Sequence, residues 1–161
     1  MGYVVYSVKL GDNVYDIANE YKTSVERIIV ANPNINIYSM RPGVEIIVPV
    51  GNVVNTQVSY SSEILEKNIR NLKLIYPFLE VGEIGKSVLN KSLPYIKIGN
   101  GNKKVFYSAA FHANEWITSL VLMKFLEEYA KAFVENKNIF GYNAQALYYT
   151  TSLYIVPMVN P

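Results

Sequence analysis

The chain has 161 residues, of which 50% are hydrophobic and 17% are charged, a balance that excludes an intrinsically disordered protein. This length fits one ordinary domain or two small ones. The formal net charge of +2 gives no reason to expect nucleic-acid binding or attraction to a membrane surface, and the absence of cysteine excludes disulfide bonds.

No apolar run reaches the length of a membrane span. The N-terminus lacks the basic region and the continuous apolar core of a secretory signal. We therefore expect cytoplasmic synthesis, followed by retention in the cell or by export along a route that the sequence does not reveal.

Residues 1–50 are predicted to form a small unit with the order strand, helix, helix, strand. Tyr6, Val8 and Leu10 alternate with polar residues, which predicts the first strand. Asp12 is the expected N-cap of the first helix. Thr23-Ser24 is expected to cap the second helix, and residues 44–49 are predicted as the closing strand.

This unit resembles the lysin motif (LysM) family. The residues that carry the resemblance are Tyr6-Ser-Val8, Gly11-Asp12-Asn13-Val14, Ile17-Ala18, Tyr21, Ile28, Ala31-Asn32-Pro33-Asn34 and Pro42-Gly43 through Ile47-Val-Pro49. The family binds glycans that contain N-acetylglucosamine, such as peptidoglycan and chitin, so the resemblance implies a glycan-binding domain.

The LysM ligand groove lies between the loop after the first strand and the loop after the second helix. Carried over to this chain, the resemblance implies a groove lined by Gly11, Asp12, Asn13, Val14, Asn32, Asn34 and Ile35. For Asp12 and Asn32 taken singly, the alternative is a structural role as helix caps and turn formers.

Residues 51–60 have no periodicity and few charges, and they are predicted to be a linker. Residues 61–161 are predicted to form an α/β domain. Its expected elements are a helix from Ser61 or Ser62 to Tyr76, strands over 79–86, 93–98 and 104–111, helices over 115–134 and 144–149, and a strand over 153–159. The strand over 104–111 is apolar on both faces, as a central strand is.

His112 is the only histidine, and Glu115 follows it by three residues at a predicted strand-to-helix turn. Imidazole and carboxylate are zinc ligands, and this spacing allows both to face one Zn²⁺. The alternative is a capping histidine at the start of the helix, with Glu115 favoured there by the helix dipole. A catalytic zinc site uses three protein ligands, and the chain offers no second histidine and no cysteine as the third.

The wider setting of this pair resembles the zinc carboxypeptidase family across residues 61–161. The residues that carry the resemblance are Gly85-Lys-Ser87, Leu93-Pro94, Ile96-Lys-Ile98-Gly99, Phe111-His-Ala-Asn-Glu-Trp-Ile-Thr118 and Val156-Pro-Met-Val-Asn160-Pro161. The resemblance implies that His112 and Glu115 are the first two zinc ligands and that Trp116 packs beside them. It also implies that Asn160-Pro161 begins the Asn-Pro-Asp-Gly turn of the family.

The sequence departs from the family pattern at two points. Asn114 stands where digestive carboxypeptidases carry a substrate-binding arginine, and this resembles the bacterial branch that cuts peptidoglycan stem peptides. The third zinc ligand, the substrate-gripping arginines and the general-base glutamate of the family would lie beyond residue 161. We therefore expect no catalytic residue within the chain, an incomplete carboxypeptidase domain whose mixed sheet has an exposed apolar edge, and poor behaviour in solution.

Together the two resemblances predict an α/β chain with a small βααβ LysM domain and part of a zinc peptidase domain. The predicted function is zinc-dependent hydrolysis of peptidoglycan stem peptides at the γ-D-glutamyl–diamino acid bond, with association to the cell wall or spore and negligible activity of these 161 residues alone. The alternatives are a glycan-binding protein with a vestigial peptidase segment, and a carboxypeptidase that acts on stem-peptide termini.

Overall fold

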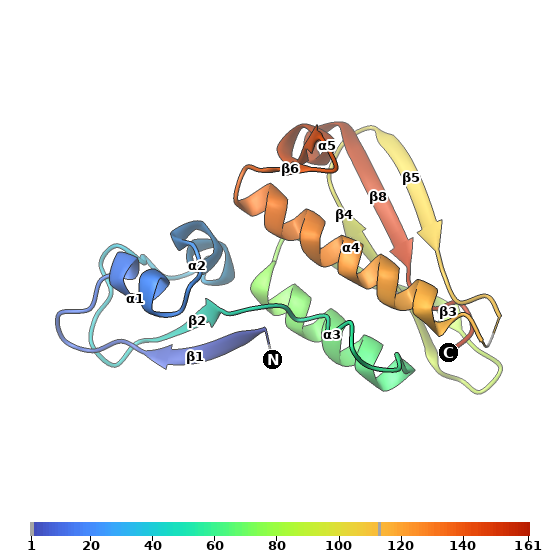
Figure 1. Cartoon of the computed structure of the whole chain (residues 1–161), viewed down its shortest axis with the longest axis horizontal. Helices are drawn as coiled ribbons and strands as arrows, with labels where there is room; N and C mark the ends of the chain where they lie inside the picture. Colours follow the sequence, from blue (N-terminus) through green and yellow to red (C-terminus); the bar gives the residue numbers. More distant parts are fainter. Residues whose placement is uncertain (1, 113) are drawn as a thin grey trace.

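The structure is a computed structural model that describes residues 2–112 and 114–161. It contains two units joined by an extended segment (Figure 1). The N-terminal unit consists of β1 (Tyr3–Ser7), α1 (Val14–Glu20), α2 (Val25–Ala31) and β2 (Glu45–Pro49). The two strands pair antiparallel, with Tyr6 opposite Ile46, and the order of elements is the predicted one.

The first helix of this unit has a different cap from the predicted one. Asn13 is the N-cap of α1, and its side-chain oxygen accepts hydrogen bonds from the backbone N–H groups of Tyr15 and Asp16, both at 3.0 Å. Asp12 was the expected cap, but its carboxylate instead accepts hydrogen bonds from the Tyr6 hydroxyl at 2.7 Å and the Lys9 backbone N–H at 2.8 Å. Asp12 therefore closes the turn after β1.

Asn32, at the end of α2, ties that helix to β2. Its side-chain nitrogen donates to the carbonyl oxygens of Ile28 and Ile47, at 2.7 and 2.8 Å, and its side-chain oxygen accepts from the Ile47 N–H at 2.8 Å. The residue is buried, so these hydrogen bonds form away from water and satisfy three backbone groups. The core beneath them is made of Tyr6, Val8, Val14, Ile17, Ala18, Ile28, Ile37, Ile46 and Val48.

The second unit is a mixed sheet covered by helices. Its elements are α3 (Ser62–Ile75), β3 (Glu80–Lys86), β4 (Ser92–Ile98), β5 (Lys103–Ser108), α4 (Trp116–Val134), β6 (Asn138–Ile139), β7 (Tyr142–Asn143), α5 (Ala144–Thr150) and β8 (Thr151–Val156). The sheet order is β3-β4-β8-β5, with β5 and β8 parallel and the other pairs antiparallel. Every helix and strand of the prediction is present, and the short β6–β7 hairpin was not predicted.

The predicted central strand lies at an edge of this sheet. Within the described residues, β5 pairs with β8 alone, and its other side has no strand beside it. Phe106 and Tyr107 of β5 are accordingly 61% and 47% exposed. Apolar side chains therefore line an open sheet edge, as the sequence predicted for the incomplete domain.

The segment predicted to be a linker is packed into the second unit. Val54 and Tyr60 are 2% and 3% exposed and belong to its core. The buried Glu127 carboxylate, on α4, accepts hydrogen bonds from the backbone N–H groups of Val53 and Val54. Because α2 also contacts α3 and α4, the N-terminal unit is docked rather than loosely tethered.

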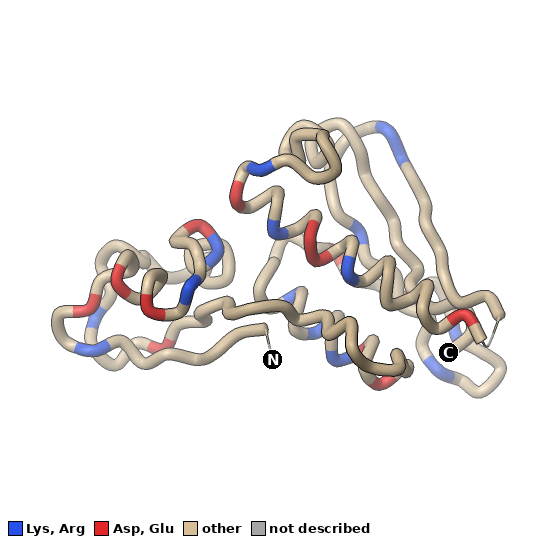
Figure 2. The backbone as a smooth tube through the Cα atoms, in the orientation of Figure 1, with Lys and Arg blue, Asp and Glu red and all other residues tan. Residues whose placement is uncertain are grey.

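Positive and negative residues are interspersed over both units (Figure 2), in keeping with the small net charge. Among the residues that the structure describes, no helix is both long and apolar enough to span a membrane.

Candidate functional site

His112 and Glu115 lie in the turn that connects β5 to α4. The backbone of this turn is fixed on two sides: the Thr118 hydroxyl accepts a hydrogen bond from the Ala110 N–H at 2.9 Å, and the Ala110 carbonyl accepts one from the Asn160 N–H at 3.0 Å. The short strand and the following helix thus hold the two side chains at one end of the sheet, where β5 and β8 also end.

The two side chains meet directly. The Nδ1 atom of His112 lies 2.8 Å from Oε1 of Glu115, and both side chains reach solvent, with exposures of 77% and 41%. The hydrogen bond from His112 holds the pKa of the Glu115 carboxyl below its usual range. Glu115 therefore presents the ionised form that a metal ligand requires.

This geometry fits a shared metal ion at the level of two donors. An imidazole nitrogen and a carboxylate oxygen are both donors that Zn²⁺ accepts, and here the two groups lie next to each other. No cluster of three or more His, Cys, Asp or Glu side chains with metal-binding geometry occurs in residues 2–112 and 114–161. The pair thus offers two donor groups of kinds that zinc accepts, one fewer than the three protein ligands of a catalytic zinc site.

A cavity of about 260 Å³ opens beside His112. Trp116 and Asn160 line it, as do Glu63 and Lys91 from α3 and the β3–β4 turn. Trp116 is 40% exposed, so one part of its ring is packed and another faces this space. The structure thereby brings together the predicted ligands, the tryptophan beside them and the Asn160-Pro161 pair.

Asn114, the predicted substrate-binding residue, is exposed in the same turn, one residue before Glu115. Its neighbour Ala113 lies outside the described residues. The sequence did not predict that Glu63 would face this cavity, because 49 residues separate it from His112 and only the packing of α3 against the sheet brings them together.

The predicted glycan-groove residues divide into exposed and buried groups. Gly11, Asn13 and Asn34 are exposed, Asp12 and Ile35 are half-buried, and Val14 and Asn32 are buried. The side-chain hydrogen bonds of Asn32 are formed within the domain, which supports the structural role considered for this residue. Asp12 and Asn13 likewise hold the loop and the start of α1 in place.

Tyr15 and Tyr38 were missed by the sequence analysis. They are 63% and 65% exposed, and their ring centroids lie 6.3 Å apart, so the start of α1 and the loop after α2 are side by side. Exposed tyrosines offer flat apolar faces on which sugar rings can stack. The only signal in the sequence was two tyrosines outside the apolar periodicity of the helices, and that is a weak one.

Comparisons with known proteins match the two units to two families. Residues 6–49 match the LysM domain, and residues 65–161 match the zinc carboxypeptidase family. A gamma-D-glutamyl-L-diamino acid endopeptidase of Lysinibacillus sphaericus is 45% identical over 109 residues, which make up 68% of this chain and 28% of that protein. The chain therefore spans less than a third of the length of this curated relative.

Solved structures show the same fold. Thrombin-activatable fibrinolysis inhibitor superposes with a TM-score of 0.57 at 21% identity, over 68% of this chain and 29% of that one. A carboxypeptidase A from Shewanella denitrificans gives a TM-score of 0.54 at 19% identity, over 73% of this chain and 31% of that one. The second unit thus has a metallocarboxypeptidase fold, and the chain belongs to the zinc carboxypeptidase family, with a LysM domain at its N-terminal side.

Proposed function

We propose that this chain directs a zinc-dependent peptidase to peptidoglycan. In this proposal the LysM domain binds wall glycan, and the second unit contributes His112 and Glu115 to a zinc site that hydrolyses stem peptides at the γ-D-glutamyl–diamino acid bond. The observation that carries it is the direct meeting of the two predicted zinc ligands at the mouth of a cavity, in a chain that also contains a LysM domain. The choice of bond is supported by the similarity to the gamma-D-glutamyl-L-diamino acid endopeptidase of Lysinibacillus sphaericus.

The glycan part of the proposal rests on the two loops at the edge of the N-terminal unit. Gly11, Asn13 and Asn34 are exposed there, close in sequence to the exposed rings of Tyr15 and Tyr38. Polar groups beside aromatic faces suit a sugar, because its hydroxyls need hydrogen-bond partners and its ring faces are apolar. We assign Val14, Asn32, Asp12 and Ile35 to the support of this surface.

The peptidase part assigns each residue of the turn a separate task. A bound zinc ion would polarise the scissile carbonyl and activate a water molecule. His112 and Glu115 would hold that ion, Trp116 would pack beside them, and Asn114 would contact the substrate. Because the described residues supply two donors and no third, we expect these 161 residues alone to hold zinc weakly and to hydrolyse peptides negligibly.

Binding without catalysis is the second candidate function, and the same two-donor set favours it. Both candidates place the protein at the cell wall, and association with the spore remains part of the proposal. They differ in whether wall peptides are cut when the chain and zinc are present together.

Sedimentation with purified, insoluble peptidoglycan tests the glycan part. We expect the chain to sediment with the wall material and the Tyr38→Ala variant to bind at least several-fold more weakly, whereas Tyr142→Ala, an equally exposed tyrosine in the second unit, should bind like the parent chain. Failure of the parent chain to sediment would overturn glycan binding. Release of new amino groups from stem peptides by the purified chain with zinc would overturn the expectation of negligible hydrolysis.

A further inference from the structure

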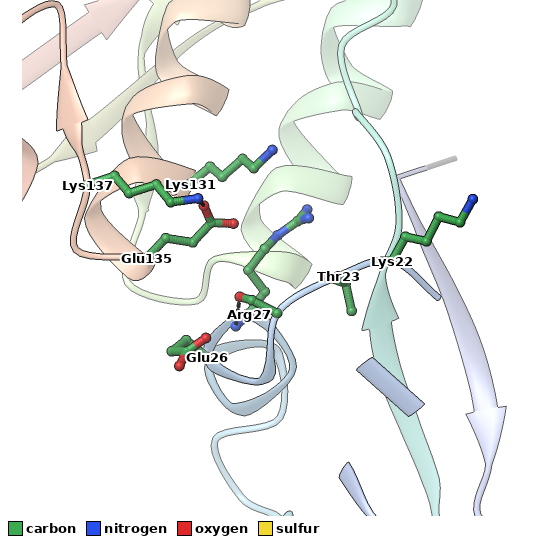
Figure 3. Close-up of a pocket in the computed structure, with 8 residues that line it drawn as sticks. Lys22, Thr23, Glu26, Arg27, Lys131, Glu135 and Lys137 are labelled. Atoms are coloured by element: carbon green, nitrogen blue, oxygen red, sulfur yellow. Dashed lines mark hydrogen bonds and ion pairs between the residues drawn. The ribbon is translucent and has the colours of Figure 1, made fainter. Parts of the chain in front are cut away.

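A second cavity, of about 410 Å³, lies between the two units and far from the His112 turn in sequence. Its walls come from the turn before α2 and the first turn of that helix on one side, and from the end of α4 and the segment after it on the other (Figure 3). Its volume falls within the range of small-ligand pockets, which is about 300–1,000 Å³.

The walls of this cavity are rich in cationic groups. Lys22, Arg27, Lys131 and Lys137 line it together with two acidic residues, Glu26 and Glu135. Glu135 is paired with Lys137 at 2.7 Å, so this acid and this base neutralise each other. Among the described residues no ion pair is formed by Arg27 or Lys131, and the cavity lining carries four cationic side chains against two acidic ones.

Arg27 is the unusual member of this set, because it is only 5% exposed. Charged side chains are almost never buried to this extent without a partner. Its Nε atom is buried and has no hydrogen-bond partner, and the same is true of the Thr23 hydroxyl on the same wall. A buried guanidinium nitrogen and a buried hydroxyl that both lack a partner mark the place of an acceptor that the described residues do not supply.

Arg27 of the first unit also lies close to Tyr76 of the second unit. Burial raises the pKa of the Tyr76 phenol to about 12, and the nearby Arg27 guanidinium opposes this rise. Tyr76 follows α3 in the second unit, whereas Arg27 belongs to α2 in the first. In Figure 3 the ends of Arg27 and Lys131 lie on the same side of the cavity, with the Glu135–Lys137 pair close by, while Lys22 points away.

We propose that this interdomain cavity binds an oxyanion, a phosphate or a carboxylate group, held by Arg27 from the LysM side and by Lys131 from the peptidase side. The anion would accept from the unpartnered Nε atom of Arg27 and lie between the positive charges of Arg27 and Lys131. Its binding would therefore fasten the LysM domain to the second unit. This inference does not depend on zinc or glycan binding.

Titration with inorganic phosphate tests the proposal on the whole chain, at constant ionic strength because salt screens such contacts. We expect saturable binding by calorimetry, a rise in the unfolding temperature with phosphate concentration, and chemical-shift changes in backbone amides on both walls. A parallel titration with acetate identifies the source: tighter binding of phosphate indicates a phosphate-bearing ligand, and tighter binding of acetate indicates a carboxylate.

Variants locate the site. Lys131→Gln should weaken the binding roughly tenfold, the worth of one charge-assisted hydrogen bond. Lys86→Gln makes the same charge change at an exposed lysine that does not line the cavity, and it should bind like the parent chain. Arg27→Lys keeps the charge while removing the Nε donor, and should also weaken the binding. Absence of saturable binding of either anion, or equal binding by the parent chain and Lys131→Gln, would overturn the proposal.

Discussion

The two units of this chain differ in how their candidate binding surfaces are supported. In the LysM domain, the buried amide of Asn32 has hydrogen-bond partners for its oxygen and its nitrogen, and two short strands pair with each other along their whole length. In the second unit, β5 pairs on one side only among the described residues and carries exposed aromatic residues, and the exposed His112 and Glu115 side chains contact each other in the turn that follows it.

The two candidate sites of the chain therefore differ in the groups that hold them in place. In the LysM domain, side-chain hydrogen bonds within the unit hold the loops that carry the candidate binding surface. In the second unit the candidate site lies at the end of an edge strand, and the described residues offer no cluster of three metal-binding side chains there. The following changes probe each side of that contrast, beginning with the largest expected effect.

Replacement of Asn32 should have the largest effect on stability. Asn32→Ala removes the partners of the Ile47 N–H and of two carbonyl oxygens, and buried groups left without partners cost about 1–3 kcal/mol each. We expect the unfolding free energy of the LysM domain to fall by about 3 kcal/mol in urea denaturation followed by circular dichroism. Asn34→Ala, at an exposed position, is the control and should be nearly neutral. A loss below about 0.5 kcal/mol, the range of ordinary surface substitutions, would contradict the role of Asn32 in tying α2 to β2.

The buried Glu127 carboxylate should be the next most sensitive group. In Glu127→Gln one of the two carboxylate oxygens is replaced by an amide nitrogen, which donates and cannot accept. The side chain can then accept from only one of the Val53 and Val54 N–H groups, and we expect the unfolding free energy to fall by about 2 kcal/mol. Hydrogen exchange of these two backbone amides should accelerate. Glu128→Gln is the matched control. Glu127 and Glu128 both pair with Lys124, at 3.0 and 2.8 Å, but the Glu128 side chain is 44% exposed. If the Val53 and Val54 amides exchange at the same rate in both variants, Glu127 does not hold the segment between the units.

The open edge of β5 should govern association of the chain in solution. Phe106 is 61% exposed on this strand, and an exposed apolar edge favours pairing with another chain. We expect concentration-dependent self-association in sedimentation velocity, and a shift toward monomer for Phe106→Lys, because a charged edge residue opposes strand pairing. A parent chain that stays monomeric at high concentration would show that this edge is harmless.

The smallest expected effect is the pH dependence that arises from Asp12. The Lys9 N–H and the Tyr6 hydroxyl donate to this carboxylate and hold its pKa below the usual value of about 3.9. A lowered pKa in the folded state contributes stability above the unfolded pKa, and that contribution is lost as the pH falls through the folded pKa. The stability of the parent chain should therefore fall more steeply below about pH 4 than that of Asp12→Asn. Parallel curves of unfolding free energy against pH for the two proteins would contradict a lowered pKa of Asp12.

Most of the fold could be predicted because the apolar periodicity is regular. The stripe of Leu65, Ile69 and Leu72 is buried on α3, and Ser61 caps that helix as expected. The cap of α1 was misplaced by one residue, because Asp12 and Asn13 are both good capping residues and only the turn geometry selects Asn13.

The candidate sites were less accessible to prediction. Local spacing was enough to place His112 beside Glu115, since three residues separate them. Glu63 beside His112, and Arg27 beside Lys131, are brought together by packing between distant segments, and no local pattern encodes such neighbours. The burial of Val54 was missed because residues 51–60 have no periodicity, although their backbone is held by a side chain 73 residues away.

The assignment of His112 and Glu115 as zinc ligands is tested most directly by a zinc titration followed through the imidazole signals of His112. Because His112 is the only histidine, its resonances are assigned without ambiguity. We predict a saturable shift of these signals near neutral pH. The zinc affinity obtained from this shift should be at least about tenfold lower in Glu115→Gln, because the loss of even an outer group around a metal lowers affinity by about that much. Glu63→Gln, which lines the same cavity, should leave the response unchanged. No response of His112 to zinc, or an equal response in Glu115→Gln, would contradict the account.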